Sequence, residues 1–198
     1  MQESSRIKDE IRILGVDDSP FTKNKNQRQN CLVIGTIFRG GNYMDGLISF
    51  NVTVDGNDST KKLISAIKKT RHYNQLNCIM LNGISLAGFN VLDIRKISSE
   101  TSLPVIVVIR KLPDLRKIEK TLTQLKFTGR VNIIKKAGRI YPVKVHKRNL
   151  FIQVAGISLE KAAQIVRLTA VHSIIPEPIR IAHIIASGIV KGESKGRA

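Results

Sequence analysis

The chain has 198 residues and carries 33 Lys and Arg against 15 Asp and Glu, which gives a formal net charge of +18. This length suits one domain over residues 1–198. Because no apolar stretch approaches the roughly 20 residues of a membrane helix and the N-terminus is too polar for a signal peptide, we expect a cytoplasmic protein that binds nucleic acid rather than a membrane.

The first predicted elements are three strands. An apolar run over 11–16 predicts the first strand, and the polar segment 19–30 after it predicts a loop. Apolar residues over 31–38 and 43–54 predict the second and third strands. A glycine pair at 40–41 between them favours a tight hairpin turn. We expect an antiparallel hairpin whose third strand lies beside the first.

The next segments alternate helix and strand. A turn over 55–60 leads into a helix, and an apolar run over 77–81 predicts a fourth strand. Segment 91–102 predicts a short helix, and the β-branched run 105–109 predicts a fifth strand buried on both faces. The order hairpin, helix, strand, helix, strand implies a mixed α/β sheet.

The second half predicts three helices and two strands. Helical spacing of apolar residues marks 114–125, and strands are expected over 140–145 and 150–154. A second helix is expected over 158–171, where Ser158 is a suitable cap. A last helix is expected over 178–190, because it starts with a proline.

Two adjacent carboxylates, Asp17 and Asp18, follow the first predicted strand. Open sheets place their chemistry at the carboxyl ends of strands, and side chains alternate between the two faces. Asp17 is therefore expected to face a site, and Asp18 to cap the turn at Ser19-Pro20. Acidic residues in so basic a chain favour a divalent cation held against a polyanion. Turn formation is the alternative role for both.

Three more acids are candidates for catalysis or metal binding. Asp55 and Asp58 flank the third strand and the first helix, and Asp93 lies in the first turn of the second predicted helix. Each has a structural alternative, because Asp55 suits a turn, Asp58 a helix cap and Asp93 a first helical turn. No motif of a serine hydrolase, a P-loop NTPase or a dinucleotide enzyme is present.

Basic residues recur in clusters that predict a groove for a phosphodiester backbone, with simple solvation as the alternative. The candidates for nucleic-acid binding are Lys68, Lys69, Arg71, Lys135, Lys136, Arg139, Lys147 and Arg148.

Five segments resemble a known family over nearly the whole chain. They are 15–21 (GVDDSPF), 81–84 (LNGI), 87–93 (AGFNVLD), 176–183 (PEPIRIAH) and 192–198 (GESKGRA). The family that the chain resembles is an archaeal one, formerly uncharacterised, that is related to endonuclease V and includes deoxyuridine endonucleases.

The resemblance implies a ribonuclease H-like fold, with a mixed five-stranded sheet flanked by helices. It also implies an endonuclease that cuts DNA containing a deaminated base, such as deoxyuridine, during DNA repair. The cofactor that it implies is Mg²⁺, with Mn²⁺ as the alternative ion. Asp17 matches the first metal ligand of endonuclease V, and Asp55 or Asp58 is the nearest counterpart of the second. Asn82 stands where the related family carries a third acid, and Asp93 is an assisting candidate.

Two other functions stay open. Because Asn82 offers a carbonyl oxygen but no charge, one alternative is a catalytically impaired or non-catalytic nucleic-acid-binding protein of the same fold. The other is an interaction protein whose basic surface meets an acidic partner.

Overall fold

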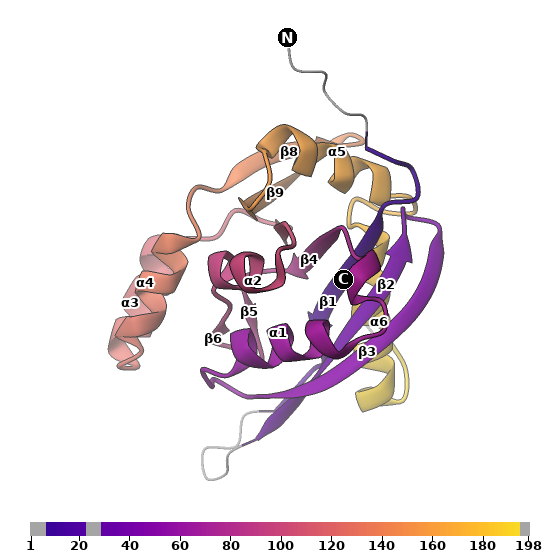
Figure 1. The fold of residues 1–198 in the computed structure, drawn as a ribbon. Helices are drawn as coiled ribbons and strands as arrows, with labels where there is room; N and C mark the ends of the chain where they lie inside the picture. The colour runs from indigo at the N-terminus through magenta and orange to yellow at the C-terminus, as the bar shows by residue number, and fades with distance from the viewer. Residues whose placement is uncertain (1–6, 23–28, 195–198) are drawn as a thin grey trace.

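The computed structural model describes residues 7–22 and 29–194, and a seven-stranded mixed sheet forms its centre (Figure 1). The spatial order of the strands is β3-β2-β1-β4-β7-β9-β8, in which β1, β4 and β7 are parallel and the other neighbours are antiparallel. The strands are β1 (Arg12–Asp18), β2 (Asn30–Arg39), β3 (Tyr43–Thr53), β4 (Cys78–Asn82), β7 (Val105–Ile109), β8 (Tyr141–Val145) and β9 (Arg148–Ala155).

Helices cover both faces of this sheet (Figure 1). Helices α1 (Ser59–Lys69) and α2 (Ile94–Thr101) pack on one face. Helices α5 (Leu159–Thr169) and α6 (Glu177–Lys191) pack on the other. Helices α3 (Leu115–Gln124) and α4 (Thr128–Lys136) form a pair beside the sheet, at the left of Figure 1.

Two short elements lie in the connections. The segment Tyr73–Gln75 is a 3₁₀ helix. Strands β5 (Ser85–Leu86) and β6 (Asn90–Val91) form a small antiparallel ribbon after β4.

The five strands expected from the first half are present, and the two later ones join the same sheet. The structure corrects the expected neighbour of the first strand, because β2 lies between β1 and β3. Strand β2 pairs antiparallel along both of its edges, so the three strands form a meander and β3 takes the outer edge. The end of β3 is therefore two strands away from the end of β1.

The helices match their expected places with two differences. Helix α2 begins at Ile94 rather than at 91, because Asn90–Val91 pairs with Ser85–Leu86 in the ribbon. Helix α4 was not predicted, since it has no buried residue and hence no clear apolar stripe. Ser158 caps α5 as expected by accepting a hydrogen bond from Lys161 N–H. Of the expected loop 19–30, residues 23–28 lie outside the described part.

Side chains of β1 alternate between the two helical layers. Leu14 and Val16 belong to the core under α1 and α2, while Ile13 belongs to the core under α5 and α6. Gly15 shares the second face, and a Cβ atom there would lie 2.3 Å from the carbonyl carbon of Pro178. Helix α6 thus packs directly on the backbone of β1. Asp17 lies two residues after Gly15, on the same face of the strand, and therefore faces α6.

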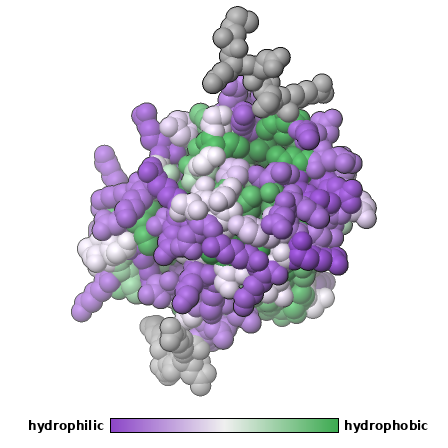
Figure 2. Space-filling view, in the orientation of Figure 1, coloured by the Kyte–Doolittle hydropathy of each residue, from purple (hydrophilic) through white to green (hydrophobic). Residues whose placement is uncertain are grey.

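The surface reflects the composition. The face seen in Figure 2 is largely hydrophilic, as the 33 Lys and Arg imply. Cys31 and Cys78 are buried core residues and form no disulfide. In the described ranges, no helix has the length and apolar character needed to span a membrane.

Candidate functional site

Asp17 lies at the centre of a buried polar cluster built from three elements. Its side chain is almost fully buried, and its Oδ2 accepts a hydrogen bond of 3.0 Å from Asn82 Nδ2. The same oxygen lies 2.8 Å from His183 Nδ1. An ionised carboxylate only accepts hydrogen bonds, so the Nδ1 nitrogen carries the proton. We call Asp17, Asn82 and His183 the Asp17 cluster.

The topology explains why Asp17 and Asn82 meet. Strands β1 and β4 are parallel neighbours, with Val16 opposite Leu81, so their carboxyl ends lie at the same edge of the sheet. Asp17 and Asn82 both follow these paired residues and face α6. Asp17 is 3% exposed, so its side chain points into the protein.

His183 is the site residue that the sequence did not reveal. It lies on α6, 166 positions from Asp17, and none of the histidines shows a metal-binding spacing. The hydrogen bond to Asp17 raises the pKa of His183 above its ordinary value, although burial and the charge of Arg110 oppose the shift. The available signal was its place at the end of the segment 176–183, which carries the resemblance.

Asp18 points to the opposite face, as its position in the strand predicts. Its Oδ2 accepts a hydrogen bond of 2.9 Å from the N–H of Ala87, in the ribbon, rather than capping the turn at Ser19-Pro20. Burial raises the pKa of Asp18 to about 6, and the charge of Asp17 adds to the shift. The Ala87 N–H group opposes it by stabilising the carboxylate.

Asp55 and Asp58 hold the same turn end of the ribbon through its other residues. Asp55 Oδ1 accepts from Phe89 N–H at 2.8 Å. Asp58 accepts from the Thr53 N–H and hydroxyl, from Asn90 Nδ2 at 2.7 Å, and pairs with Lys62 Nζ at 2.8 Å. Burial disfavours the charge of Asp58, but these hydrogen bonds together hold its pKa well below the usual range.

The predicted metal set is not assembled around Asp17. Within residues 7–22 and 29–194, no three or more His, Cys, Asp or Glu side chains form a group suited to a metal ion. The carboxylates of Asp55 and Asp58 are engaged by the ribbon, and Asp93 caps α2 by accepting from Lys96 N–H at 3.0 Å. Of the five predicted catalytic residues, Asp17 and Asn82 are joined by a hydrogen bond.

The predicted basic residues fall into three regions. The first group lies at and after the end of α1, where Lys68 pairs with Glu100, and the second lies at and after the end of α4, where Lys135 pairs with Glu119. The third is at the turn between β8 and β9, where Lys147 lies in the turn and Arg148 begins β9. Of the eight candidates, Arg148 lines a cavity beside the Asp17 cluster.

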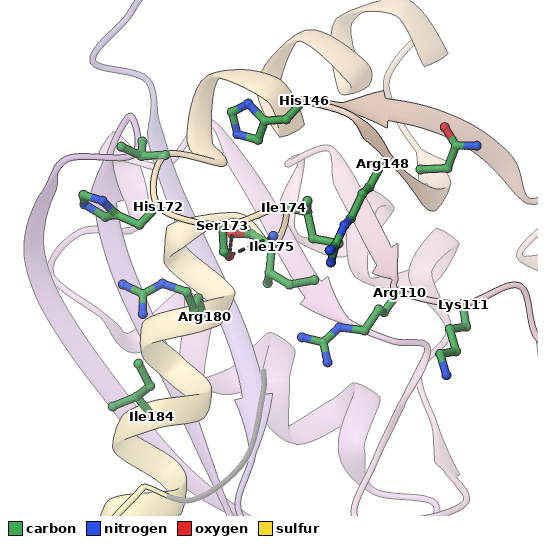
Figure 3. Close-up of a pocket in the computed structure, with 12 residues that line it drawn as sticks. Arg110, Lys111, His146, Arg148, His172, Ser173, Ile174, Ile175, Arg180 and Ile184 are labelled. Atoms are coloured by element: carbon green, nitrogen blue, oxygen red, sulfur yellow. Dashed lines mark hydrogen bonds between the residues drawn. The ribbon is translucent and has the colours of Figure 1, made fainter.

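This cavity has a volume of about 930 Å³ and lies between α6 and the β8–β9 turn (Figure 3). We call it the basic cavity. The residues that line it are Arg110, Lys111, His146, Arg148, Asn149, Val171, His172, Ser173, Ile174, Ile175, Arg180 and Ile184.

Comparison with known proteins places the chain in a family. The sequence profile described as endonuclease dU matches residues 9–190. A UPF0215 protein of Methanothermobacter thermautotrophicus is 48% identical over 195 residues, which cover 98% of this chain and 94% of that protein.

Two solved structures resemble this fold. A protein of unknown function from Archaeoglobus fulgidus has a TM-score of 0.81 and 34% identity, over 92% of this chain and 99% of that one. Endonuclease V of Bacillus subtilis has a TM-score of 0.62 and 12% identity, over 96% of this chain and 85% of that one. The ribonuclease H-like α/β fold is confirmed, with two strands beyond the five expected. Together with the profile match, these similarities show that the chain belongs to the endonuclease dU family.

Proposed function

We propose that this protein is a metal-dependent endonuclease that cuts DNA containing a deaminated base, such as deoxyuridine, as a step of DNA repair. Membership of the endonuclease dU family supports a nuclease that acts on DNA. The observation that carries the proposal is the buried carboxylate of Asp17, held by Asn82 and His183 beside a cavity rich in cationic side chains.

Asp17 is the residue that would hold Mg²⁺ or Mn²⁺. Its carboxylate suits these ions, which favour carboxylate and substrate phosphate oxygens as ligands. Asn82 can add an amide oxygen after rotation of its side chain, but no charge. When bound, the ion supplies Lewis-acid stabilisation of charge on the scissile phosphate. In this proposal Asp55 and Asp58 hold the ribbon in place, and Asp93 caps α2.

His183 has two roles in this proposal. Its Nδ1–H group fixes the orientation of the Asp17 carboxylate, as Asn82 does from the other side. Its raised pKa favours the doubly protonated ring, the form in which Nε2 carries a proton beside Nδ1. A proton at this atom can pass to the oxygen that leaves phosphorus when the phosphodiester bond breaks.

A second candidate function is nucleic-acid binding without cleavage. Asn82 favours it, because its N–H donates to Asp17 where another carboxylate would strengthen cation binding. For this candidate we expect the protein to bind nucleic acid with an affinity that falls as the salt concentration rises, and not to cut it.

The deciding experiment is a nicking assay on an end-labelled duplex that contains one deoxyuridine, with a thymidine duplex as the comparison. We expect Mg²⁺-dependent nicking of the deoxyuridine strand by the wild type and nearly complete loss in Asp17→Asn. Asp114→Asn is the matched control, since Asp114 caps α3 on the surface and Asn caps almost as well. Equal nicking by Asp17→Asn would refute the proposed site, and binding without nicking by the wild type would establish the second candidate.

A further inference from the structure

We propose that the basic cavity is a phosphate subsite, which binds a phosphate of the substrate strand near the one at Asp17. This inference rests on the proposed function for the identity of the strand. It adds a second binding site and two residues, Arg110 and Arg148, that fix the position of the DNA.

Four residues form a row along one edge of the sheet. Strands β1, β4, β7 and β9 are successive neighbours. Asp17 and Asn82 end the first two, Arg110 directly follows β7, and Arg148 begins β9. Because β9 is antiparallel to β7, with Ile109 opposite Phe151, its first residue lies at the edge where β7 ends.

All four side chains face the α6 side. On β7, Ile106 and Val108 lie in the core under α5 and α6, and Arg110, two residues after Val108, continues the same face. On β9, Leu150 and Ile152 lie in that core, and Arg148, two residues before Leu150, is on the same face. Figure 3 shows both arginine side chains extending toward α6 and the segment that leads into it.

Distances along the row suit a single DNA strand. Neighbouring strands lie about 4.8 Å apart, and the pairing register puts Arg148 four residues beyond the level of Asp17, so the two backbone positions are roughly 19 Å apart. The side chains of Arg110 and Arg148 extend from these positions toward α6, which carries His183 (Figure 3). A strand with one phosphate at Asp17 can therefore place another phosphate, one or a few nucleotides away, at the two arginines.

The chemistry of the cavity favours an anion. No Asp or Glu is among its lining residues, while Arg110, Lys111, Arg148 and Arg180 are. Within the described residues, Lys111 and Arg148 make no ion pair with a carboxylate. Arg180, in contrast, forms an ion pair of 2.6 Å with Glu177, a buried residue that does not line the cavity.

Arginine is suited to phosphate because its planar guanidinium offers paired donors. The apolar part of the wall, which includes Ile174, Ile175 and Ile184, gives the sugar a surface to pack on. A volume of about 930 Å³ leaves room for a nucleotide. The basic cavity therefore fits a phosphodiester and its sugar better than a free ion.

The test is a methylphosphonate scan. Each phosphate near a single deoxyuridine is replaced in turn by an uncharged methylphosphonate, and binding is measured by fluorescence anisotropy in EDTA, where no cleavage occurs. We expect one or two positions beside the cleavage site at which the substitution weakens binding by wild type. Arg148→Gln should bind the unmodified duplex more weakly than the wild type does. Methylphosphonate substitution at those same positions should no longer weaken its binding.

The salt dependence gives an independent readout. The log–log slope of affinity against salt should become shallower by about 0.9 in Arg148→Gln, the value for one lost phosphate contact. Lys61→Gln is the matched control, because Lys61 is exposed on α1 at the opposite face of the sheet. Arg148 is itself exposed, so its replacement leaves the core intact.

Failure of this inference is distinguishable from failure of the proposed function. If Arg148→Gln keeps the wild-type interference pattern and salt slope, the subsite is refuted even though the wild type still nicks. If the pattern depends on Arg148 in a protein that does not nick, the subsite stands and the nuclease proposal falls. Binding of polyglutamate that Arg148→Gln weakens as much as DNA binding would refute a phosphodiester ligand.

Discussion

Asp17 on β1 and His183 on α6 share a hydrogen bond of 2.8 Å across 166 positions of sequence. The contact depends on how closely α6 approaches β1. Gly15, two residues before Asp17, lets the backbone of Pro178 lie against the strand. Thr36 on β2 fixes the same point, because its hydroxyl donates to the Pro178 carbonyl at 2.6 Å.

Gly15→Ala should weaken both stability and nicking. The new Cβ atom would lie 2.3 Å from backbone carbon of Pro178, so α6 must shift. Overpacking of this kind costs about 1–3 kcal/mol, and it draws His183 away from Asp17. Urea unfolding and the nicking assay measure the two effects. Gly188→Ala is the control on the same helix, where nothing lies near the new atom, and it should stabilise by up to about 1 kcal/mol. Equal stability of the two variants would contradict this account of α6 packing.

The sequence predicted the half of the site that depends on local patterns. An apolar run ending at Asp17 marks a buried strand and its carboxyl end, and a second such run ends beside Asn82. It could not predict His183, because no local pattern tells which strand edge a distant helix crosses. It also could not separate metal ligands from loop anchors, since both roles use the same carboxylate, as Asp58 illustrates.

Asn82→Asp should lower the stability of the metal-free protein and strengthen its binding of a divalent cation. The variant loses the hydrogen bond that Asn82 donates to Asp17 and sets two carboxylates side by side, which costs about 1–3 kcal/mol without metal. Added Mg²⁺ or Mn²⁺ relieves that repulsion. Calorimetry should therefore show a lower Tm than wild type in EDTA and a larger upward shift with metal. A metal shift no larger than that of wild type would indicate that residue 82 does not face the cation.

Asp58→Asn tests whether Asp58 anchors the ribbon or binds metal. The variant keeps one acceptor oxygen but loses the ion pair with Lys62 and the charge that strengthens the bond from Asn90. We expect a loss of about 1–3 kcal/mol in unfolding free energy and faster hydrogen exchange at residues 87–90. Nicking by the folded variant should stay near the wild-type level. Complete loss of nicking at unchanged stability would instead make Asp58 a metal ligand.

Asp45→Asn should show a pH-dependent loss of stability far from the site. Asp45 accepts from Arg39 and from Arg12, and these bonds hold its pKa well below the usual range. A carboxyl with a lowered pKa stabilises the fold above its unfolded value of 3.8 and loses this effect as the pH falls. Wild type should be more stable than the variant at pH 7, and the two should converge in acid. A difference that does not change between pH 7 and pH 3 would rule out the ion pairs as its source.

His183→Asn should abolish most of the nicking and alter its pH profile. Loss of a general acid lowers the rate by about 10²–10⁴-fold. Because the bond to Asp17 raises the pKa of His183 above 6.5, the wild-type rate should fall as the pH rises through that raised pKa and the ring loses its second proton. That alkaline fall should vanish in the variant. His72→Asn, which changes a histidine beyond α1, should keep both the rate and the profile.

Stability supplies a second readout for the same pair. A histidine with a raised pKa stabilises the fold fully below pH 6.5, and the contribution fades as the pH rises through the folded value. The difference in unfolding free energy between wild type and His183→Asn should therefore be larger at pH 6 than at pH 9. If nicking is lost while this difference stays constant, His183 acts without the charged contact to Asp17. If nicking persists with the wild-type profile, the proton comes from another group, and His183 only positions Asp17.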